Sequence, residues 1–423
     1  MPPKQLILLA SAFTYRANAF EEAAQRLGIP VVRGTDVPPP MLGKVSIPLA
    51  IDYRDLPRSA IQIEQYAREH PIGAIIGLDD SGTLLAAAAS ELIDLPYNAP
   101  EAALAARDKH LMRQKFAAAG VSSPNFHHYH LDADISSIAA QTRFPCVIKP
   151  TTLSGSRGVM RADHPVEFLQ RVEQLKKILA NEPCDEFLVE DFIPGVEVAL
   201  EGLMDYGTLH VLALFDKPDP LDGPYFEETI YVTPSRLPKK TQKAITQVAG
   251  QAAAALGLVT GPIHAELRVD KGKPVMVEVA ARSIGGSCSK TLRFDLNTSL
   301  EELIIRQAFQ YPVSNIQSFD QRLPVAAQDK SPVSASGVMM IPIPYSGLLS
   351  RVEGLEAAAR IPAITEIEIT AGLNRPIHAL PEGDSYLGFI FARGETPEAV
   401  EAALREAHAC LSIEIAPELP LIN

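Results

Sequence analysis

The sequence predicts a protein of mixed α/β and α+β class with more than one domain. Strand and helix patterns alternate over the first hundred residues, which is typical of a parallel α/β sheet, whereas farther along several short strands cluster around one long helix. Of the 423 residues, 47% are hydrophobic and 21% are charged, as in ordinary folded proteins. At roughly 100 to 200 residues per domain, the chain is long enough for two to four domains with a cleft between them.

The charge balance excludes several classes of partner. The chain has 38 basic and 51 acidic side chains and a net charge of -13, the wrong sign for general attraction to nucleic acid or anionic lipid. No segment approaches the roughly 18 consecutive apolar residues of a membrane span. The four cysteines contain no CxxC pair, which indicates reduced thiols. We therefore expect a cytoplasmic protein that binds small molecules, with no nucleic acid and no membrane as partner.

The first region is expected to be a small doubly wound α/β sheet. Its predicted strands are Gln5–Ala10, Ile29–Val32 and Ala74–Leu78, and its predicted helices are Ala17–Leu27, Ser59–Glu69 and Thr83–Leu92. No GxGxxG motif follows the first strand, so a dinucleotide site has no support. The polar segment Asp79–Gly82 follows a strand and either faces a ligand at the carboxyl edge of the sheet or only caps the next helix.

The remaining chain is expected to form two α+β regions, which gives predicted domains of residues 1–106, 107–310 and 311–423. The expected helices are Arg107–Ala119, Lys239–Leu256 and Pro397–Cys410. The expected strands of the second region are Phe187–Glu190, Glu197–Met204, Leu209–Phe215, Ile263–Val269 and Pro274–Val279. Those of the tail, expected to be a small module of its own, are Ser336–Ile343, Ile364–Thr370 and Ser385–Arg393.

A lysine before a Ser/Gly-rich loop is the first candidate for chemistry. Lys149 ends a predicted strand and is followed by the loop Ser154–Gly158, within a strand, loop and strand pattern over Phe144–Val159. The ammonium group and the N–H groups of such a loop can hold phosphate oxygens. The lysine precedes the glycines, so this is not a Walker A loop. A surface hairpin is an equally good interpretation of this segment alone.

Two further clusters carry carboxylates. Glu190 and Glu197 flank a turn, seven residues apart, a spacing that suits the adenine edge and the ribose of one nucleotide, although Glu197 alone is typical of a solvated strand. Glu266 and Glu278 lie on two segments joined by a turn, and a hairpin can bring them together. Paired carboxylates repel unless a cation lies between them, which favours magnesium, while a solvated face paired with Arg268 is the alternative.

These segments, in this order, resemble the ATP-grasp superfamily over most of the chain. The resemblance implies an ATP-grasp fold with an amino-terminal Rossmann-like α/β domain and a carboxyl-terminal α+β module. The segments Glu278–Gly286, Gly347–Leu355 and Leu387–Phe389 resemble the L-amino acid ligase branch of that superfamily. In such enzymes the γ-phosphate of ATP passes to a substrate carboxylate, and an amine attacks the resulting acyl phosphate.

The resemblance also implies roles for individual residues. The phosphates would be held by Lys109 and Lys149 and covered by Ser154, Gly155, Ser156 and Gly158. The adenine would lie against Glu190 and Ile193, with Glu197 on the ribose, and magnesium, or manganese as an alternative, would be bound by Glu266 and Glu278. Arg282, Gly285 and Gly286 would be catalytic and stabilise the acyl phosphate and the tetrahedral intermediate, with Arg282 and Glu228 on the substrate.

Two departures from the family pattern leave alternatives open. Many members have Glu-x-Asn where this chain has Glu278-Val279-Ala280, so either one metal or two metals bridged by Glu278 are compatible with the sequence. Glu228 either pairs with a substrate ammonium group or is a surface loop residue, and Tyr231 stands where the branch often has a histidine. Dimers are common among relatives, which leaves a homodimer open.

Three functions remain as hypotheses. The first is an ATP-dependent carboxylate–amine ligase with an amino acid as acyl donor. The second is a ligase acting on a purine-pathway or carboxylation substrate, and the third is an ATP-binding regulator without turnover. The histidines His127, His128 and His130 are not expected to bind a metal, because no carboxylate pattern lies near them in the sequence, and Cys288 has no paired histidine for a nucleophilic role.

Overall fold

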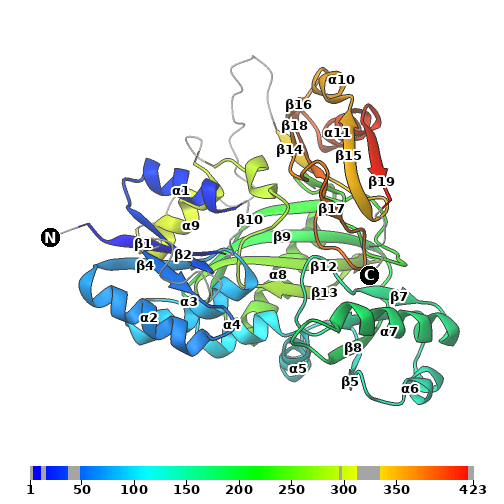
Figure 1. Cartoon of the computed structure of the whole chain (residues 1–423), viewed down its shortest axis with the longest axis horizontal. Helices are drawn as coiled ribbons and strands as arrows, with labels where there is room; N and C mark the ends of the chain where they lie inside the picture. Colours follow the sequence, from blue (N-terminus) through cyan, green and yellow to red (C-terminus); the bar gives the residue numbers. More distant parts are fainter. Residues whose placement is uncertain (1–2, 11–15, 37–47, 295–297, 312–333, 418–423) are drawn as a thin grey trace, which may run out of the picture.

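The computed structural model describes residues 3–10, 16–36, 48–294, 298–311 and 334–417, and it confirms the predicted mixed class. Figure 1 shows an amino-terminal α/β unit in blue on the left and a long central sheet in green. A small sheet with helices α6 and α7 lies at the lower right, and the carboxyl-terminal segments lie at the upper right. No helix within the described ranges is long and apolar enough to cross a membrane.

The amino-terminal unit is a parallel four-stranded sheet with the order β3-β2-β1-β4, as the alternating pattern predicted. Side chains of β1 alternate between its two faces: Leu6 and Leu8 pack in a cluster with α1 and α9, whereas Ile7 and Leu9 pack in a cluster with α2 and α3. The elements are β1 Gln5–Ala10, α1 Ala17–Arg26, β2 Val31–Asp36, β3 Leu49–Ile51, α2 Leu56–Glu69, β4 Ile72–Gly77, α3 Asp80–Leu92 and α4 Pro100–Arg107.

The predicted helix Arg107–Ala119 differs from the structure at its start. Asp108 has an extended backbone and accepts hydrogen bonds from the N–H groups of His110 and Leu111, so it ends α4 and caps a new helix, α5 Lys109–Ala119. The chain then forms a small antiparallel sheet with the order β5-β8-β6-β7, covered by two helices. Its elements are β5 Phe126–His130, α6 Ile135–Gln141, β6 Cys146–Pro150, β7 Met160–Ala162, α7 Pro165–Leu179 and β8 Glu186–Asp191.

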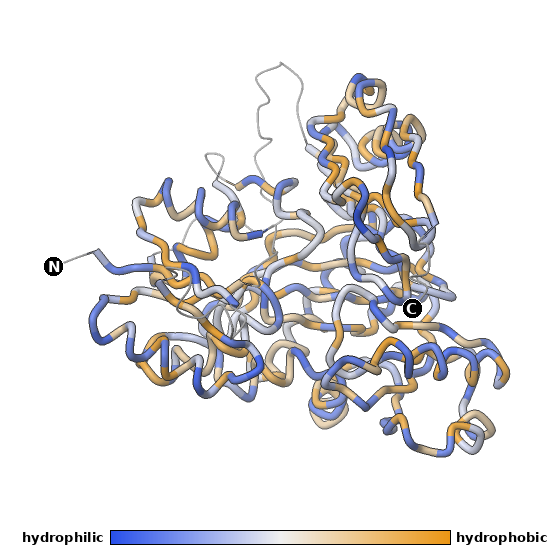
Figure 2. Tube along the Cα trace, in the orientation of Figure 1, coloured by the Kyte–Doolittle hydropathy of each residue, from blue (hydrophilic) through white to orange (hydrophobic). Residues whose placement is uncertain are grey.

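An eight-stranded sheet with the order β13-β12-β9-β10-β11-β14-β18-β16 forms the centre of the molecule. Its strands form orange, apolar stretches in Figure 2, and α8 packs against it. The strands of its first half are β9 Val196–Asp205, β10 Thr208–Lys217, β11 Ile230–Thr233, β12 Gly261–Asp270 and β13 Lys273–Ala280, and helix α8 spans Lys239–Leu256. The predicted strands of this region and the predicted helix over Lys239–Leu256 are confirmed.

The sequence suggested that the tail forms a module of its own. In the structure, only part of it does. Its strands β14, β18 and β16 continue the central sheet, because β14 pairs with β11 in the register Ile230↔Met339, and a second sheet has the order β17-β15-β19. The boundaries at residues 106 and 310 stay predictions. The remaining elements are α9 Leu300–Ala308, β14 Ala335–Ile341, β15 Gly347–Glu353, α10 Leu355–Ala359, β16 Ile364–Ile369, β17 Pro376–Ile377, β18 Gly388–Gly394, α11 Pro397–Ala409 and β19 Ser412–Ala416.

Two glycines provide a test of the packing. A Cβ atom on Gly77 at the end of β4 would lie 2.3 Å from the backbone of Gly82, whereas a Cβ on Gly250 inside α8 would meet only Leu209, at 4.0 Å. We expect Gly77→Ala to lower the free energy of unfolding by about 1–3 kcal/mol through overpacking. Gly250→Ala is expected to raise it by up to about 1 kcal/mol, because alanine favours the helix. Urea denaturation followed by circular dichroism measures both changes in unfolding free energy. Equal changes in the two variants would contradict the close packing around Gly77.

Candidate active site

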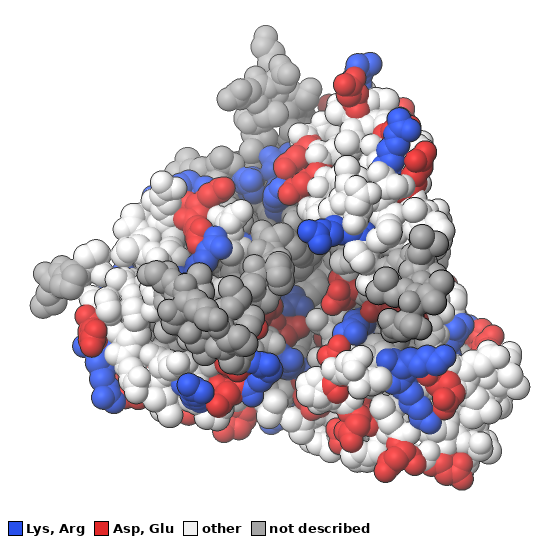
Figure 3. Space-filling model, in the orientation of Figure 1, with Lys and Arg blue, Asp and Glu red and all other residues white. Residues whose placement is uncertain are grey.

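A cavity of about 800 Å³ lies between the amino-terminal unit, the β5–β8 sheet and the central sheet. Figure 3 shows acidic and basic side chains next to each other in the hollow at the centre of the displayed face. Gly158 is not among the lining residues. All the other predicted site residues line the cavity: Lys109, Lys149, Ser154, Gly155, Ser156, Glu190, Ile193, Glu197, Glu228, Glu266, Glu278, Arg282, Gly285 and Gly286.

A buried ion triad fixes the position of Lys149. Lys149 on β6 lies 2.7 Å from an oxygen of Glu190 on β8, and Arg113 of α5 donates from Nε to the other oxygen of Glu190 at 2.7 Å. Burial and the charge of Arg113 lower the pKa of Lys149 to about 8, although Glu190 opposes this shift. The Glu190 carboxylate is thus engaged with two cations, and its predicted place against adenine stays a prediction. Arg113, which the sequence analysis missed, follows Lys109 by one helical turn.

Lys109 connects two other parts of the site. Its Nζ donates to the carbonyl oxygen of Leu153 at 2.7 Å and lies 3.4 Å from an oxygen of Glu278. The first contact ties the start of α5 to the segment before the Ser/Gly loop, and the second ties it to β13. The side chain is almost fully buried, so its charge acts on the cavity with little screening by water.

The predicted hairpin of β12 and β13 is confirmed. Glu266 and Glu278 are directly opposite each other in its register, on one face of the sheet.

His264, on the same face as Glu266, lies 3.3 Å from it and 3.5 Å from the buried Glu201. Burial alone would lower the pKa of His264, but the two carboxylates raise it to about 9, which favours the protonated imidazole.

Lys217, at the end of β10, is a central cavity residue that the sequence analysis missed. Its ammonium group lies 2.8 Å from Glu197 and 3.0 Å from Glu266, and it also contacts Glu228. Burial lowers its pKa, but the three carboxylates outweigh burial and hold that pKa well above the ordinary value. The segment Lys217-Pro218 repeats the Lys-Pro pattern of Lys149 at the end of a strand, which was the available signal.

The surroundings of Lys217 also shift the pKa values of two neighbouring groups, Glu228 and Tyr231. Burial and the neighbouring Glu266 raise the pKa of Glu228 to about 7, even though Lys217 opposes the shift. Tyr231 on β11 places its ring 4.9 Å from the Lys217 ammonium, and burial together with Glu228 raises the pKa of this phenol well above its usual value. Tyr231 is therefore a neutral hydroxyl at physiological pH and unsuited to act as a base.

Arg282 is held by the amino-terminal unit. Its Nε donates to the Asp80 carboxylate at 2.6 Å, at the start of α3. Burial would raise the pKa of Asp80, but Arg282 and other cations hold it below the usual value. Asp79 accepts a hydrogen bond from the N–H of Gly82, so the polar strand end caps α3, as one interpretation predicted, and it also lines the cavity; that it faces a ligand stays a prediction.

The Ser/Gly loop closes one side of the cavity against the carboxyl-terminal region. The N–H of Gly158 donates to the carbonyl oxygen of Pro381 at 2.9 Å, and Nε of Arg157 donates to that of Glu382 at the same distance. Gly158 has a φ of +75°, and an added Cβ would meet Leu175 at 3.0 Å, so glycine suits this position.

Cys288 also lines the cavity, but burial raises the pKa of its thiol well above the ordinary value, which argues against a nucleophilic role.

Comparisons with known proteins match two segments of the chain. Residues 142–291 match an ATP-grasp domain, and residues 339–416 match the L-amino acid ligase C-terminal domain 2. The first segment contains the Ser/Gly loop, the triad residues Lys149 and Glu190, and the hairpin of Glu266 and Glu278. The second contains β16 and β18 and the last three residues of β14.

Two relatives are named as a synthase and a ligase. The chain is 28% identical to dapdiamide A synthase of Enterobacter agglomerans over 52% of each chain. It is 26% identical to the alanine–anticapsin ligase of Bacillus subtilis over 52% of this chain and 50% of that one. The chain thus spans about half the length of these two relatives. The L-amino acid ligase structure from Bacillus licheniformis superposes with a TM-score of 0.78 and 26% identity, covering 98% of this chain and all of that one.

Removing the Lys217 ammonium tests whether it neutralises the carboxylate cluster. We expect Lys217→Met to cost about 3–5 kcal/mol of unfolding free energy, because the buried carboxylates lose their common cation. Magnesium chloride without nucleotide should recover part of this loss. The measurement is thermal unfolding with and without magnesium.

Lys290→Met is the matched control, since Lys290 also bridges two carboxylates, Glu366 and Glu368, both at 2.9 Å, but its side chain is 38% exposed. This change should cost at most about 1 kcal/mol and show no magnesium response. Equal losses in the two variants would argue against the role assigned to Lys217.

Proposed function

We propose that the chain is an ATP-grasp ligase of the L-amino acid ligase type, which joins a carboxylic acid to an amine with release of ADP and phosphate; the matches to an ATP-grasp domain and to an L-amino acid ligase C-terminal domain support this. The single structural observation that supports this is the cavity, which collects lysines, opposed carboxylates and an arginine from all parts of the fold. The proposed acyl donor is a small L-amino acid. Its carboxylate becomes an acyl phosphate, and the amine of the second substrate then attacks the acyl carbon.

We assign ATP to the side of the cavity between the β5–β8 sheet and the central sheet. The buried ammonium groups of Lys109, Lys149 and Lys217 provide positive charge for the phosphates, and Ser154, Gly155 and Ser156, which line the cavity, add N–H donors. Ile193 provides apolar surface for adenine. Glu197 lies on the next strand, β9, and is the proposed ribose acceptor.

Glu266 and Glu278 are the proposed ligands of the divalent metal that ATP-grasp enzymes use. Their carboxylate oxygens suit a hard cation such as magnesium, which would neutralise charge on the phosphates. In the structure each of the two is neutralised by a lysine: Lys217 lies 3.0 Å from Glu266, and Lys109 lies 3.4 Å from Glu278. Both lysines are therefore close enough to exchange a carboxylate for a phosphate oxygen once the ligands bind.

Arg282 and the turn after it are the proposed oxyanion donors. The guanidinium is oriented by Asp80 at 2.6 Å, and the turn is held by Glu201, which accepts from the N–H of Ile284 at 3.0 Å. Preorganised donors of this kind stabilise charge that develops on an acyl phosphate or tetrahedral oxygen. Glu228, which also lines the cavity, is the proposed partner of the substrate ammonium group.

The match of residues 339–416 to an L-amino acid ligase domain favours this function over a purine-pathway or carboxylation substrate. One observation favours a regulator without turnover: Ala280 stands at the end of β13 where many family members have asparagine, and its apolar side chain provides no metal ligand. Turnover assays separate these functions.

The test is phosphate release from ATP and magnesium with the twenty amino acids, singly and in pairs, followed by mass spectrometry of the active mixtures. We expect release that needs two amino acids and a product that has lost one water. Glu278→Gln should abolish it without changing the thermal unfolding of the protein. Nucleotide binding without turnover in any mixture would instead support the regulator, and a product from a non-amino-acid substrate would reject the assigned donor.

Glu228→Gln tests the ammonium contact. We expect a KM for the acyl-donor amino acid at least about tenfold higher, because a neutral amide loses the charge-assisted hydrogen bond, while the KM for ATP changes little. Glu227→Gln is the matched control: this adjacent carboxylate accepts from the backbone N–H of Ile343 at 3.3 Å instead. Steady-state kinetics with each substrate varied in turn measure both variants. Equal KM changes in the two would contradict the assignment.

A further inference from the structure

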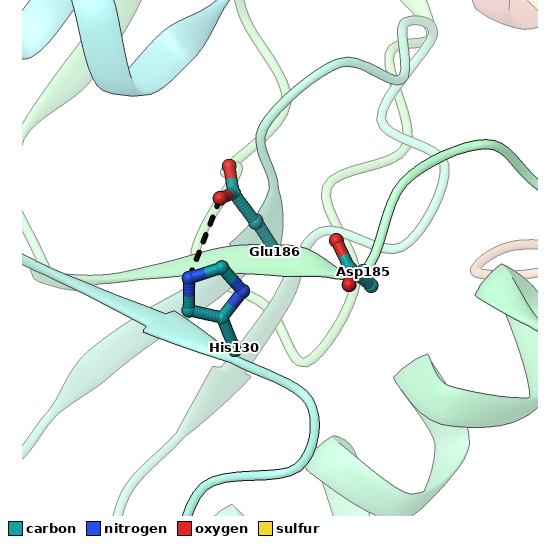
Figure 4. Close-up of side chains that lie close together, drawn as sticks. All are labelled: His130, Asp185 and Glu186. Atoms are coloured by element: carbon teal, nitrogen blue, oxygen red, sulfur yellow. Dashed lines mark ion pairs between the residues drawn. The ribbon is translucent and has the colours of Figure 1, made fainter.

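A second group of metal-ligating side chains lies on the β5–β8 sheet, outside the cavity. His128 and His130 are two residues apart on β5 and point to the same face, and Glu186 on β8 is directly opposite His130. Figure 4 shows the side chains of His130 and Glu186 pointing toward one another from adjacent strands, with Asp185 beside them. None of these residues is among those that line the 800 Å³ cavity.

The structure corrects the expectation that these histidines have no carboxylate nearby. Asp185 and Glu186 are distant in sequence, but the antiparallel pairing of β5 with β8 brings them to the histidines. Glu186 places one oxygen 3.2 Å from Nε2 of His128 and the other 3.5 Å from Nε2 of His130. Potential ligand atoms of His130, Asp185 and Glu186 lie within 4.8 Å of one another.

The separations suit a transition-metal ion. Zinc binds imidazole nitrogen and carboxylate oxygen at about 2.0–2.2 Å in tetrahedral geometry, which places neighbouring ligand atoms about 3.3 Å apart. Both measured separations between imidazole nitrogen and carboxylate oxygen are close to that value. An all-oxygen set would favour magnesium or calcium, whereas a mixed set with two imidazoles favours zinc and similar ions.

The His128 ring is already held in a fixed orientation. It stacks on the ring of His110 from α5, with centroids 3.8 Å apart, and its Nε2 is buried. Among the described residues this nitrogen has no hydrogen bond of acceptable geometry, although Glu186 is near. A ligand nitrogen that is buried, oriented and unsatisfied is suited to metal coordination, because its ordering cost is met by the fold.

We propose that His130, Asp185 and Glu186, whose ligand atoms lie within 4.8 Å of one another, form with His128 on the other oxygen of Glu186 a binding site for a divalent transition-metal ion of the zinc type, separate from the metal site of the cavity. The ion joins the edge strand β5 to β8 through side chains. This proposal does not depend on the proposed ligase activity, because it concerns a different face of the protein.

The test is a zinc titration of the full chain, freed of metal by a chelator, with excess magnesium present to occupy the carboxylates of the cavity. Calorimetry should give one tight zinc ion per chain. We expect His128→Gln, His130→Gln and Glu186→Gln each to weaken zinc binding at least about tenfold. Cobalt offers a second readout, because imidazole ligation changes its visible absorption whereas magnesium is silent.

His127→Gln is the matched control, because His127 lies on the same strand but points to the opposite face, with its ring 6.3 Å from that of Tyr129. It should leave zinc affinity unchanged. Circular dichroism of each variant separates lost binding from lost folding. The proposal is overturned if the wild-type chain binds no zinc, if His127→Gln weakens binding as much as His130→Gln, or if Glu278→Gln removes the zinc signal and so places the ion in the cavity.

Discussion

The contact between one buried ammonium group and three carboxylates is the interaction on which the rest of the cavity depends. Lys217 joins Glu197 of β9, Glu228 of the segment before β11 and Glu266 of β12. Without a shared cation, three carboxylates at this spacing would repel one another or take up protons. The lysine therefore lets an acidic pocket exist in the absence of ligands, and it holds the segment before β11 against the central sheet.

The same balance of charge recurs around the cavity. Lys149 and Arg113 share Glu190, Lys109 is near Glu278, and Arg282 is paired with Asp80. Each of these cations is thus positioned by an acid of the same protein. A bound polyanion would take the place of the carboxylates beside the lysines, and its metal cation would take the place of the lysines beside the carboxylates. Because both kinds of partner are already in position, the site can accept the ligands with little rearrangement of the backbone.

The sequence predicted those parts of the fold that depend on local periodicity and turns. The hairpin that opposes Glu266 and Glu278, the helix Lys239–Leu256 and the loop after Lys149 all follow from spacing within short segments. It did not predict partners set by packing between distant segments. Arg113 and Lys217 were missed for this reason.

Long-range strand pairing explains the remaining differences. The histidines of β5 had no acid near them in sequence, and only the pairing with β8 supplied Glu186. Likewise, a tail with its own strands and helix resembles an independent module, and no local pattern shows that β14 pairs with β11. The order of strands in a sheet is a property of the whole fold, which a single sequence encodes only weakly.

The continuous central sheet has a consequence for how such proteins can diverge or be recombined. The edge of β11 is covered by β14 over four residue pairs, from Ile230↔Met339 to Thr233↔Ser336. A chain cut after the first half of the sheet would expose that edge, and unpaired edges promote aggregation. Exchange of carboxyl-terminal segments between relatives must therefore preserve this register and the apolar residues beneath it. The pairing of β11 with β14, more than the catalytic residues, limits which segments can be exchanged.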